Sequence, residues 1–417
     1  MEDARYLVVG SSHAALEAVT AIRMHDPDGS LALVTRDGHL PYSPTVLPYV
    51  VSGRSAPDRI FLRSKEFFAE RHVDYNPGQA LVRLDPPRNT AHLAGGRTMR
   101  YEKLLLATGA APVIPPIPGL DTVQYHVLRT LDDALKLKAA IGASRQAVVL
   151  GGGLVGMHAA ENLVTAGAKV TIIEMQDQVL GAYFDRQAAG FIARAFIDHG
   201  ASIITGRRVV GLAPSAQGAT VSLDDGGTLE TDLLLVATGV KPDLGYLADS
   251  GVNCAAGIIV NHDMGTNIDN IWAAGDCAQA KDFYHEGTSM NAILPDATEQ
   301  GRIAGMSMAG DPGCKGYRGG VPLNTYHFFG RHAIAVGTGV VPTGGLERLR
   351  VDDAAGRYLR VIFQDGRLLG IFGISEFFDS GIMWQLILRR IDLTDRLEQL
   401  VADPLKVGRE LMSQLWR

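Results

Sequence analysis

Residues 147–156 read AVVLGGGLVG, an apolar run that leads directly into a glycine-rich loop with the spacing GxGxxG. In this spacing the first glycine makes a tight turn, the second lets the backbone approach a pyrophosphate, and the third lets the following helix pack on the strand. The N–H groups at the start of that helix then face the phosphates. The loop therefore predicts a dinucleotide-binding βαβ unit with Gly151, Gly153 and Gly156 at its turn.

The continuation of this unit indicates which dinucleotide it binds. A helical run through Thr165 and an apolar strand from Lys169 to Ile173 lead to Glu174. A carboxylate at this strand end accepts hydrogen bonds from both ribose hydroxyls of the adenosine and repels a 2′-phosphate, so it favours NAD over NADP. The alternative reading of Glu174 is a solvated charge at the end of a strand.

A second and less regular βαβ unit opens the chain. The strand Tyr6 to Val9 runs into a loop from Gly10 to Ala15, in which Ser12 and Ala15 stand where the second and third glycines would be. Small residues at these places still allow a close approach of the backbone to a pyrophosphate. Asp37, after the next strand, is the predicted ribose acceptor.

Two similar turns indicate where the chain crosses between domains. Apolar runs end in Ala-Thr-Gly at residues 107–109 and again at 237–239, and prolines follow each turn. From Gly319 onward, strands with glycine turns precede helices rich in Leu and Arg. The sequence thus predicts an α/β fold with two Rossmann-like domains and a C-terminal α+β interface domain. The predicted boundaries are 1–112 with 242–318 for the first dinucleotide-binding domain, 113–241 for the second, and 319–417 for the interface domain.

The bulk composition excludes several classes of protein. A length of 417 residues exceeds one ordinary core, and 46% hydrophobic with 20% charged residues is close to the globular average. The net charge of −6 comes without a dense basic run, so nucleic acid is not an expected partner. The sequence shows neither a secretory signal nor a run of about 18 apolar residues, so we expect a cytoplasmic protein without a membrane span.

The cysteines provide no redox centre by themselves. Cys254, Cys277 and Cys314 are far apart in the sequence, and no CxxC pair occurs. They therefore offer no disulfide framework, zinc site or iron–sulfur cluster, and we expect no metal in this chain. An iron–sulfur centre would have to belong to a partner.

A third motif connects both nucleotide loops to a known family. Residues 266–276 read TNIDNIWAAGD, a turn and a short apolar strand that end in a glycine beside a carboxylate. Together with both glycine loops and both Ala-Thr-Gly turns, this pattern resembles the pyridine nucleotide-disulfide oxidoreductase family, most closely its rubredoxin, ferredoxin and nitrite reductase flavoproteins. The resemblance implies FAD in the first dinucleotide-binding domain and NAD(H) in the second, with a hydride exchanged between them.

The resemblance also implies the residues of both sites. Asp276 would accept a hydrogen bond from a ribityl hydroxyl, and Arg129 would lie along the FAD, with a surface helix cap as its alternative reading. His158 stands where relatives commonly have a Glu near the nicotinamide, and an ordinary helix histidine is the alternative. The implied set is Gly10, Ser12, Ala15, Asp37, Ala80, Thr108, Gly109, Arg129, Gly275, Asp276 and Gln300 for FAD, and Gly151, Gly153, Gly156, His158, Glu174 and Gly239 for NAD.

The sequence departs from the family on the flavin side. The loop from Leu40 to Pro48 has no cysteine, so thiol-relay chemistry is not expected. Pro44-Thr45 replaces the Arg-Pro of closer relatives, so an arginine contact to the flavin is not carried over. His13 resembles a histidine near the flavin in NADH oxidase and peroxidase relatives, and we retain it only as a flavin neighbour. No protein residue is predicted to be catalytic, because the flavin itself is the electron sink.

These observations predict an oxidoreductase that transfers a hydride between NAD(H) and FAD and relays electrons to or from an iron–sulfur protein. The segment from Ile374 to Trp416 is the predicted docking surface for that partner, and it is similar to the tail of flavoprotein subunits in 2-oxoacid dehydrogenase complexes of the phenylglyoxylate type. Two alternatives remain open. One is a free-standing NADH oxidase or peroxidase, and the other is a non-enzymatic flavoprotein that senses NADH.

Overall fold

The computed structural model describes residues 2–415, which form two compact units. Each unit combines segments that are distant in the sequence. The first unit contains the residues up to Val113, Arg129–Ala134 and Val240–Gly320, and the second contains Ile114–Leu128, Leu135–Gly239 and the chain from Val321 onward.

A seven-stranded sheet forms the centre of the first unit. Among its five parallel strands, β2 and β17 are buried along their whole length, and β1 and β6 are apolar and buried towards their carboxyl ends. The edge strand β3 is polar and partly exposed. An antiparallel hairpin, β4 and β5, extends the sheet beyond β6. The strands are β1 (Glu2–Val9), β2 (Leu31–Thr35), β3 (Val73–Pro77), β4 (Leu81–Asp85), β5 (Thr90–Leu93), β6 (Thr98–Leu106) and β17 (Ile271–Ala273).

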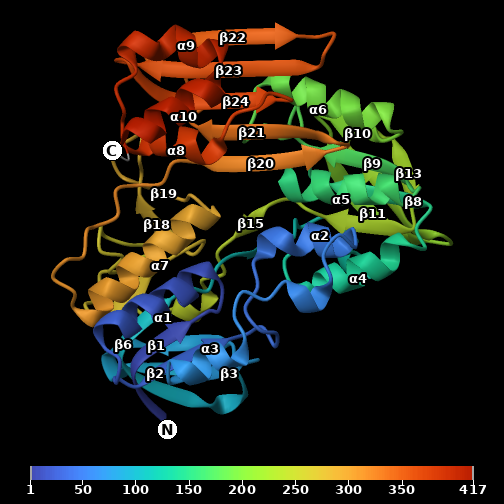
Figure 1. The fold of residues 1–417 in the computed structure, drawn as a ribbon. Helices are drawn as coiled ribbons and strands as arrows, with labels where there is room; N and C mark the ends of the chain where they lie inside the picture. The colour runs from blue at the N-terminus through green and yellow to red at the C-terminus, as the bar shows by residue number, and fades with distance from the viewer. Residues whose placement is uncertain (1, 416–417) are drawn as a thin grey trace. The chain divides into compact units, whose positions relative to one another are not determined.

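Two helices of the first unit, α1 (His13–His25) and α7 (Leu294–Ala309), lie side by side (Figure 1). A Cβ atom at Gly301 would lie 2.1 Å from the carbonyl oxygen of Ala14, so this close packing requires glycine. The remaining elements of the unit are α2 (Leu47–Val51), α3 (Lys65–Glu70), β7 (Ala111–Pro112), β15 (Val240–Lys241), β16 (Ile258–Ile259), β18 (Ala278–Lys281) and β19 (Thr288–Ser289).

The second unit contains a four-stranded parallel sheet in the order β10-β9-β8-β14. An antiparallel meander of β11, β12 and β13 follows β10 in the chain. Helix α4 (Leu131–Ile141) enters this unit from Leu135 onward. The other elements are β8 (Gln146–Leu150), α5 (Leu154–Thr165), β9 (Lys169–Glu174), α6 (Arg186–Asp198), β10 (Ser202–Thr205), β11 (Val209–Ser215), β12 (Gly218–Leu223), β13 (Thr228–Thr231) and β14 (Leu233–Val236).

An antiparallel five-stranded sheet completes the second unit, in the order β20-β21-β24-β23-β22. Helix α8 packs against β20, β21 and β24, and α9 and α10 follow it in the chain (Figure 1). The elements are β20 (Leu323–Phe328), β21 (Arg331–Gly337), β22 (Leu346–Asp352), β23 (Arg357–Gln364), β24 (Arg367–Ile374), α8 (Ser380–Leu388), α9 (Leu397–Ala402) and α10 (Pro404–Leu415).

The expected α/β fold with two βαβ units is confirmed, and so are the C-terminal strands and helices. The three domain boundaries remain a prediction. The compact units differ from them at Arg129–Ala134, which lies in the first unit although it was placed within 113–241. The reason is that this segment bonds to the first unit, since Arg129 contacts Asp276 and the backbone N–H of Leu131 donates to Tyr42. Among the helices described, none has the length and apolar character needed to cross a membrane.

Candidate functional site

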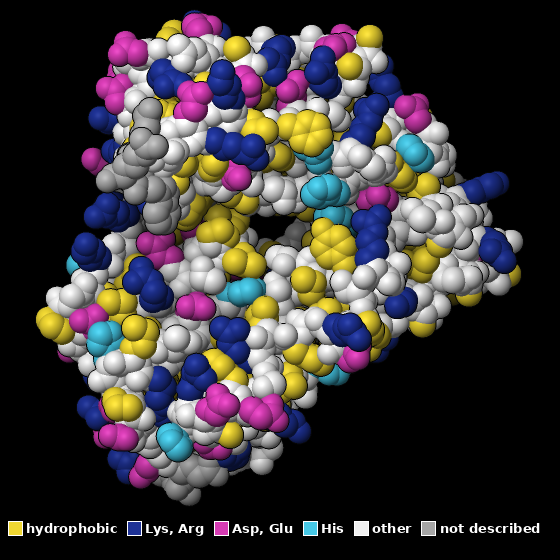
Figure 2. Space-filling model, in the orientation of Figure 1, with side chains coloured by type: hydrophobic (Ala, Val, Ile, Leu, Met, Phe, Trp, Pro, Cys, Tyr) yellow, Lys and Arg dark blue, Asp and Glu magenta, His cyan; other side chains and the backbone are white. Residues whose placement is uncertain are grey.

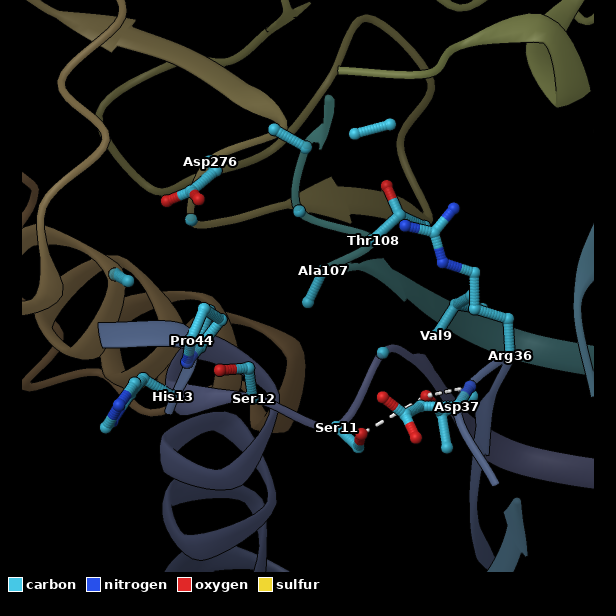
Figure 3. Close-up of a pocket in the computed structure, with 18 of the residues that line it drawn as sticks. Val9, Ser11, Ser12, His13, Arg36, Asp37, Pro44, Ala107, Thr108 and Asp276 are labelled. Carbon is cyan, nitrogen blue, oxygen red and sulfur yellow. Dashed lines mark hydrogen bonds between the residues drawn. The ribbon is translucent and has the colours of Figure 1, made fainter. Parts of the chain in front are cut away.

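A pocket of about 610 Å³ lies in the first unit, at the carboxyl ends of β1, β2, β6 and β17 (Figure 3). In parallel sheets, ligands bind at this edge, where the loops that follow the strands meet. Arg36 and Asp37 lie towards one end of the pocket in Figure 3, and His13 and Pro44 lie towards the other. The pocket therefore extends from the end of β2 to the glycine loop and the loop from Leu40 to Pro48.

Gly10 forms the turn between β1 and α1 and has no possible substitute there. Its φ is +119°, and a Cβ atom would lie 2.1 Å from the carbonyl oxygen of Ala107. Ser12 is the N-cap of α1, yet its side chain makes no capping hydrogen bond. The first N–H groups of α1 thus border the pocket, and helix N-termini of this kind bind phosphate.

Asp37 is held in place by bonds from its own loop. Its Oδ1 accepts from the backbone N–H of His39 at 2.9 Å, and its Oδ2 accepts from the Tyr42 hydroxyl at 2.5 Å. The Tyr42 oxygen in turn accepts from the N–H of Leu131 at 2.9 Å. Burial, together with the hydrogen bond to Asp37, raises the pKa of Tyr42 well above its usual range, so Tyr42 remains a donor. A carboxylate has about four acceptor sites, so Asp37 retains capacity for ribose hydroxyls.

Arg129 and Asp276 form an ion pair at the pocket wall, with 2.9 Å between Nη2 and Oδ2. Both side chains are about one-fifth exposed (19% and 22%). Arg129 also donates from Nε to the carbonyl oxygen of Ala110 at 2.9 Å. Asp133 accepts from the backbone N–H groups of Arg129 and Thr130, which fixes the segment. Arg129 is thus a built part of the site and not a surface cap.

His13 presents a neutral imidazole to the pocket. Its Nε2 is buried and has no hydrogen-bond partner among the described residues. Burial lowers the pKa of His13, and the charge of Arg63 lowers it further, whereas the charge of Asp276 opposes the shift. An orphaned buried nitrogen is costly unless a ligand satisfies it. The imidazole therefore marks a place where a polar ligand atom fits.

Most of the predicted FAD residues line this pocket, and two do not. Ala15 is fully buried in α1. Gln300 lies behind the pocket, where its Oε1 accepts from the N–H of Gly275 at 2.9 Å and holds the loop that carries Asp276. The residues that do line it are Gly10, Ser12, His13, Asp37, Ala80, Thr108, Gly109, Arg129, Gly275 and Asp276.

Several lining residues were not predicted from the sequence. Tyr42 stands in the cysteine-free loop from Leu40 to Pro48. Tyr246 follows the second Ala-Thr-Gly turn, and its hydroxyl is 2.9 Å from that of Thr108. The start of α7, Ile293 and Leu294, also borders the pocket. No local sequence pattern predicts that these residues line the pocket, because segments far apart in the sequence meet there.

The second glycine loop lies in the second unit, between β8 and α5. Gly151 has a φ of +104°, and a Cβ atom there would lie 2.4 Å from the carbonyl oxygen of Ala237. A Cβ atom at Gly156 would lie 2.0 Å from the carbonyl oxygen of Gly151. Gly153 is extended and has open space around it, which leaves room for a pyrophosphate. Gly239, at the second Ala-Thr-Gly turn, also has open space beside it.

The side chain of Glu174 accepts a hydrogen bond from the same loop. Its Oε2 accepts from the N–H of Gly152 at 2.7 Å, and its Oε1 accepts from the N–H of Gln176 at 2.8 Å. The carboxylate is therefore fixed beside the glycine turn instead of extending freely into solvent. His158, one turn into α5, lies edge-on to the ring of Tyr326 with 4.6 Å between centroids.

The residues of the first pocket fit an FAD, and those of the second loop fit an NAD. The first site offers phosphate-binding N–H groups, a fixed carboxylate for a ribose, an ion pair and a neutral donor or acceptor in one elongated pocket. Cys277 stays outside that pocket, fully buried with its Sγ 3.3 Å from the carbonyl oxygen of Leu106. Within residues 2–415, no cluster of three or more His, Cys, Asp or Glu side chains is suited to hold a metal ion.

The chain is similar to known proteins along its whole length. The sequence profile of the family described as Pyridine nucleotide-disulphide oxidoreductase matches residues 4–303. The chain is 64% identical, over 100% of its own length and 99% of the relative, to the NADH-dependent phenylglyoxylate dehydrogenase subunit epsilon of Aromatoleum evansii. It is 29% identical to a probable ferredoxin reductase of Castellaniella defragrans, over 96% and 97% of the two chains. The crystal structure of a ferredoxin reductase from Rhodopseudomonas palustris superimposes with a TM-score of 0.81 at 26% identity, covering 90% of this chain and 91% of that one.

Proposed function

The chain belongs to the pyridine nucleotide-disulphide oxidoreductase family, and from that premise we propose that it is the NADH-linked flavoprotein subunit of a 2-oxoacid dehydrogenase complex of the phenylglyoxylate type. It is an oxidoreductase with FAD and NAD(H) as cofactors. The observation that supports the proposal best is a pocket whose lining fits a flavin and holds no cysteine, in a chain similar over its full length to such a subunit.

The chain's own residues bind and orient the two dinucleotides. Asp37 and the start of α1 would hold the adenosine ribose and pyrophosphate of FAD, and Asp276, balanced by Arg129, would accept from the ribityl chain. Glu174 would bind the ribose of NAD(H). When bound, FAD accepts a hydride from NADH and can release electrons singly. No residue of this chain needs to donate a proton to the nicotinamide.

Because the pocket has no redox cysteine, this chain offers no thiol that could accept electrons from the flavin. The pocket wall at Ser43, Pro44 and Thr45 has no sulfur, and Cys277 is shielded by the backbone around it. A one-electron carrier must therefore come from a partner, and an iron–sulfur protein suits the ferredoxin reductase relatives. Such a complex would operate in the cytoplasm, where NAD(H) is available.

The C-terminal helices and the edge strand β22 are the proposed docking surface. Basic and acidic side chains are intermingled over this part of the molecule (Figure 2). Many of them are paired, including Arg348 with Glu398 at 2.8 Å and Arg350 with Glu376 at 2.9 Å. Recognition by a partner would therefore depend on shape and on apolar contacts such as the exposed Phe377 more than on net charge.

The test is anaerobic purification of the tagged full-length chain from its native host, with flavin and iron determination on the eluted material. We expect about one FAD per chain, together with iron-containing subunits that support phenylglyoxylate-dependent NAD reduction. A chain that elutes without iron and consumes oxygen with NADH at full catalytic rate would instead be a free-standing NADH oxidase. A chain that forms a stable NADH complex but turns over with no acceptor would be a sensor.

A further inference from the structure

One carboxyl group is buried beside the flavin pocket without having been assigned any role. Asp296 lies in the first turn of α7 and is 1% exposed. Its neighbours in that turn, Leu294 and Ala297, line the pocket. A Cβ atom at Gly320 would lie 1.6 Å from the Asp296 Oδ2, so backbone packs directly on the carboxyl group. Buried carboxylates are rare unless they are paired, and Asp296 forms no ion pair among the described residues.

The donors around Asp296 are too few for a buried carboxylate. Asn291 donates from Nδ2 to Oδ2 at 2.5 Å, and the Tyr317 hydroxyl is the other polar group that acts on the carboxyl group. The Asp296 Oδ1 is buried and has no partner among the described residues. An unsatisfied anionic oxygen in this position is costly, whereas a carboxylic acid is tolerated there.

The groups that face Asp296 favour its protonated form. Glu299 on the same helix repels a second negative charge, and its own charge is moderated by Arg302 and Arg318. Helix α1 meets α7 through alanines, which contribute no charge. Burial, the largest effect, together with Glu299 raises the pKa of Asp296 to about 7, although the bonds from Tyr317 and Asn291 oppose the shift. Asp296 is thus balanced between its two states near neutral pH.

Polar side chains lie between Asp296 and the flavin loop. The Tyr317 hydroxyl interacts electrostatically with both Asp296 and Gln300. Gln300 in turn accepts from the N–H of Gly275, the residue directly before Asp276. A change of charge at Asp296 therefore acts on the flavin pocket through space, across the first turn of α7, whose Leu294 and Ala297 line that pocket.

We propose that Asp296 is a positioning residue that tunes the electron affinity of the flavin site by taking up a proton when that site is reduced. The inference rests on the FAD pocket of the proposed function. The hydride from NADH brings two electrons and one proton, and the additional proton comes from solvent and forms an O–H bond on the Asp296 carboxylate. Reoxidation by the partner releases that proton. By linkage, protonation of Asp296 favours reduction as much as reduction favours protonation.

The experiment is a potentiometric titration of the FAD-loaded full-length protein between pH 5.5 and 9, with dithionite as reductant, for wild type and Asp296→Asn. In wild type we expect the plot of midpoint potential against pH to steepen near the pH at which Asp296 titrates. Asp296→Asn carries no charge at any pH, so it should lose this feature. Its potential should equal that of wild type at pH 5.5 and exceed it at pH 9.

A matched variant tests the assignment in the opposite way. Glu299→Gln removes the repulsion that favours protonated Asp296, so the steeper region should move to lower pH without disappearing. If Asp296→Asn fails to retain FAD, Asn291→Ala is used in its place. Loss of the Asn291 donor should move the steeper region of the plot of midpoint potential against pH to higher pH. Parallel curves for wild type and the variants would overturn the proposal. Since dithionite needs no nicotinamide, failure of NADH to reduce the flavin would contradict the proposed function alone.

Discussion

The two proposed dinucleotide sites of this chain each hold a ribose-binding carboxylate, but with different kinds of contact. Glu174 is fixed by N–H groups of Gly152 and Gln176, all within a single βαβ unit. Asp37 is fixed by the Tyr42 hydroxyl, which is itself held by the N–H of Leu131, 89 residues further along the chain. The carboxylate of the proposed NAD site is thus held within one βαβ unit, whereas that of the proposed FAD site depends on a contact from a distant segment. This difference suits a nicotinamide that exchanges in every cycle and a flavin that remains bound.

Substitution of the glycine turns should give the largest difference between the sites. Gly10→Ala places a Cβ atom against the Ala107 carbonyl at a positive φ, so we expect loss of bound FAD and destabilisation of about 1–3 kcal/mol or more. Gly38→Ala, which meets nothing within 4 Å and has no positive φ, is the control and should keep both flavin and Tm. Flavin absorbance per chain and thermal unfolding measure the effects. A flavin-replete Gly10→Ala protein would refute the assigned turn.

Removal of Arg129 should weaken FAD binding by about 10- to 100-fold, because charge-assisted hydrogen bonds contribute about 1.5–3 kcal/mol. Arg129→Met leaves Asp276 without its cation and deletes the bond to Ala110. Reconstitution of the apoprotein with FAD, followed by fluorescence, gives the Kd. Arg100→Met is a suitable comparison, since Arg100 is an exposed arginine of the same unit that does not line the pocket. Equal Kd values for both variants would show that the ion pair does not hold the cofactor.

Glu174→Ala should affect only the nicotinamide. We expect a rise of roughly tenfold in the Kd for NADH and a smaller preference for NADH over NADPH, because the ribose acceptor and the charge that repels a 2′-phosphate are both lost. The FAD content should remain that of wild type, since Glu174 bonds only within its own unit. Anaerobic titration of flavin reduction with each nucleotide measures both quantities. An unchanged preference for NADH over NADPH would show that Glu174 is only a solvated charge at the end of a strand.

Tyr42→Phe should have the smallest effect. It deletes one hydroxyl between Asp37 and Leu131, which corresponds to about 0.5–1.5 kcal/mol and a few-fold weaker FAD binding. Affinity for NADH should not change. The pKa of Tyr42 is raised, so the hydroxyl stays protonated through neutral pH and the difference from wild type should be constant between pH 6 and 9. Reconstitution of the apoprotein with FAD at several pH values checks this. A difference in FAD affinity that varies with pH would show that the effect does not come from a protonated Tyr42 hydroxyl.

The same contrast explains what the sequence could predict. Gly151, Gly156 and Glu174 belong to a pattern of fixed local spacing, so their positions follow from the chain itself. Tyr42, Tyr246 and Asp296 carry no such pattern, because their surroundings arise when segments far apart in sequence meet. Gln300 is implied as an FAD residue by resemblance, and the structure places it behind the pocket as a support for Gly275.

The most direct test of the proposed function is the fate of electrons from NADH in the isolated FAD-loaded chain, followed by stopped-flow absorbance without oxygen. We expect rapid reduction of the flavin by NADH, slow reoxidation when oxygen is added, and fast reoxidation by the iron–sulfur subunits purified with the chain. Reoxidation by oxygen at the rate of NADH turnover, with no acceleration by those subunits, would contradict it.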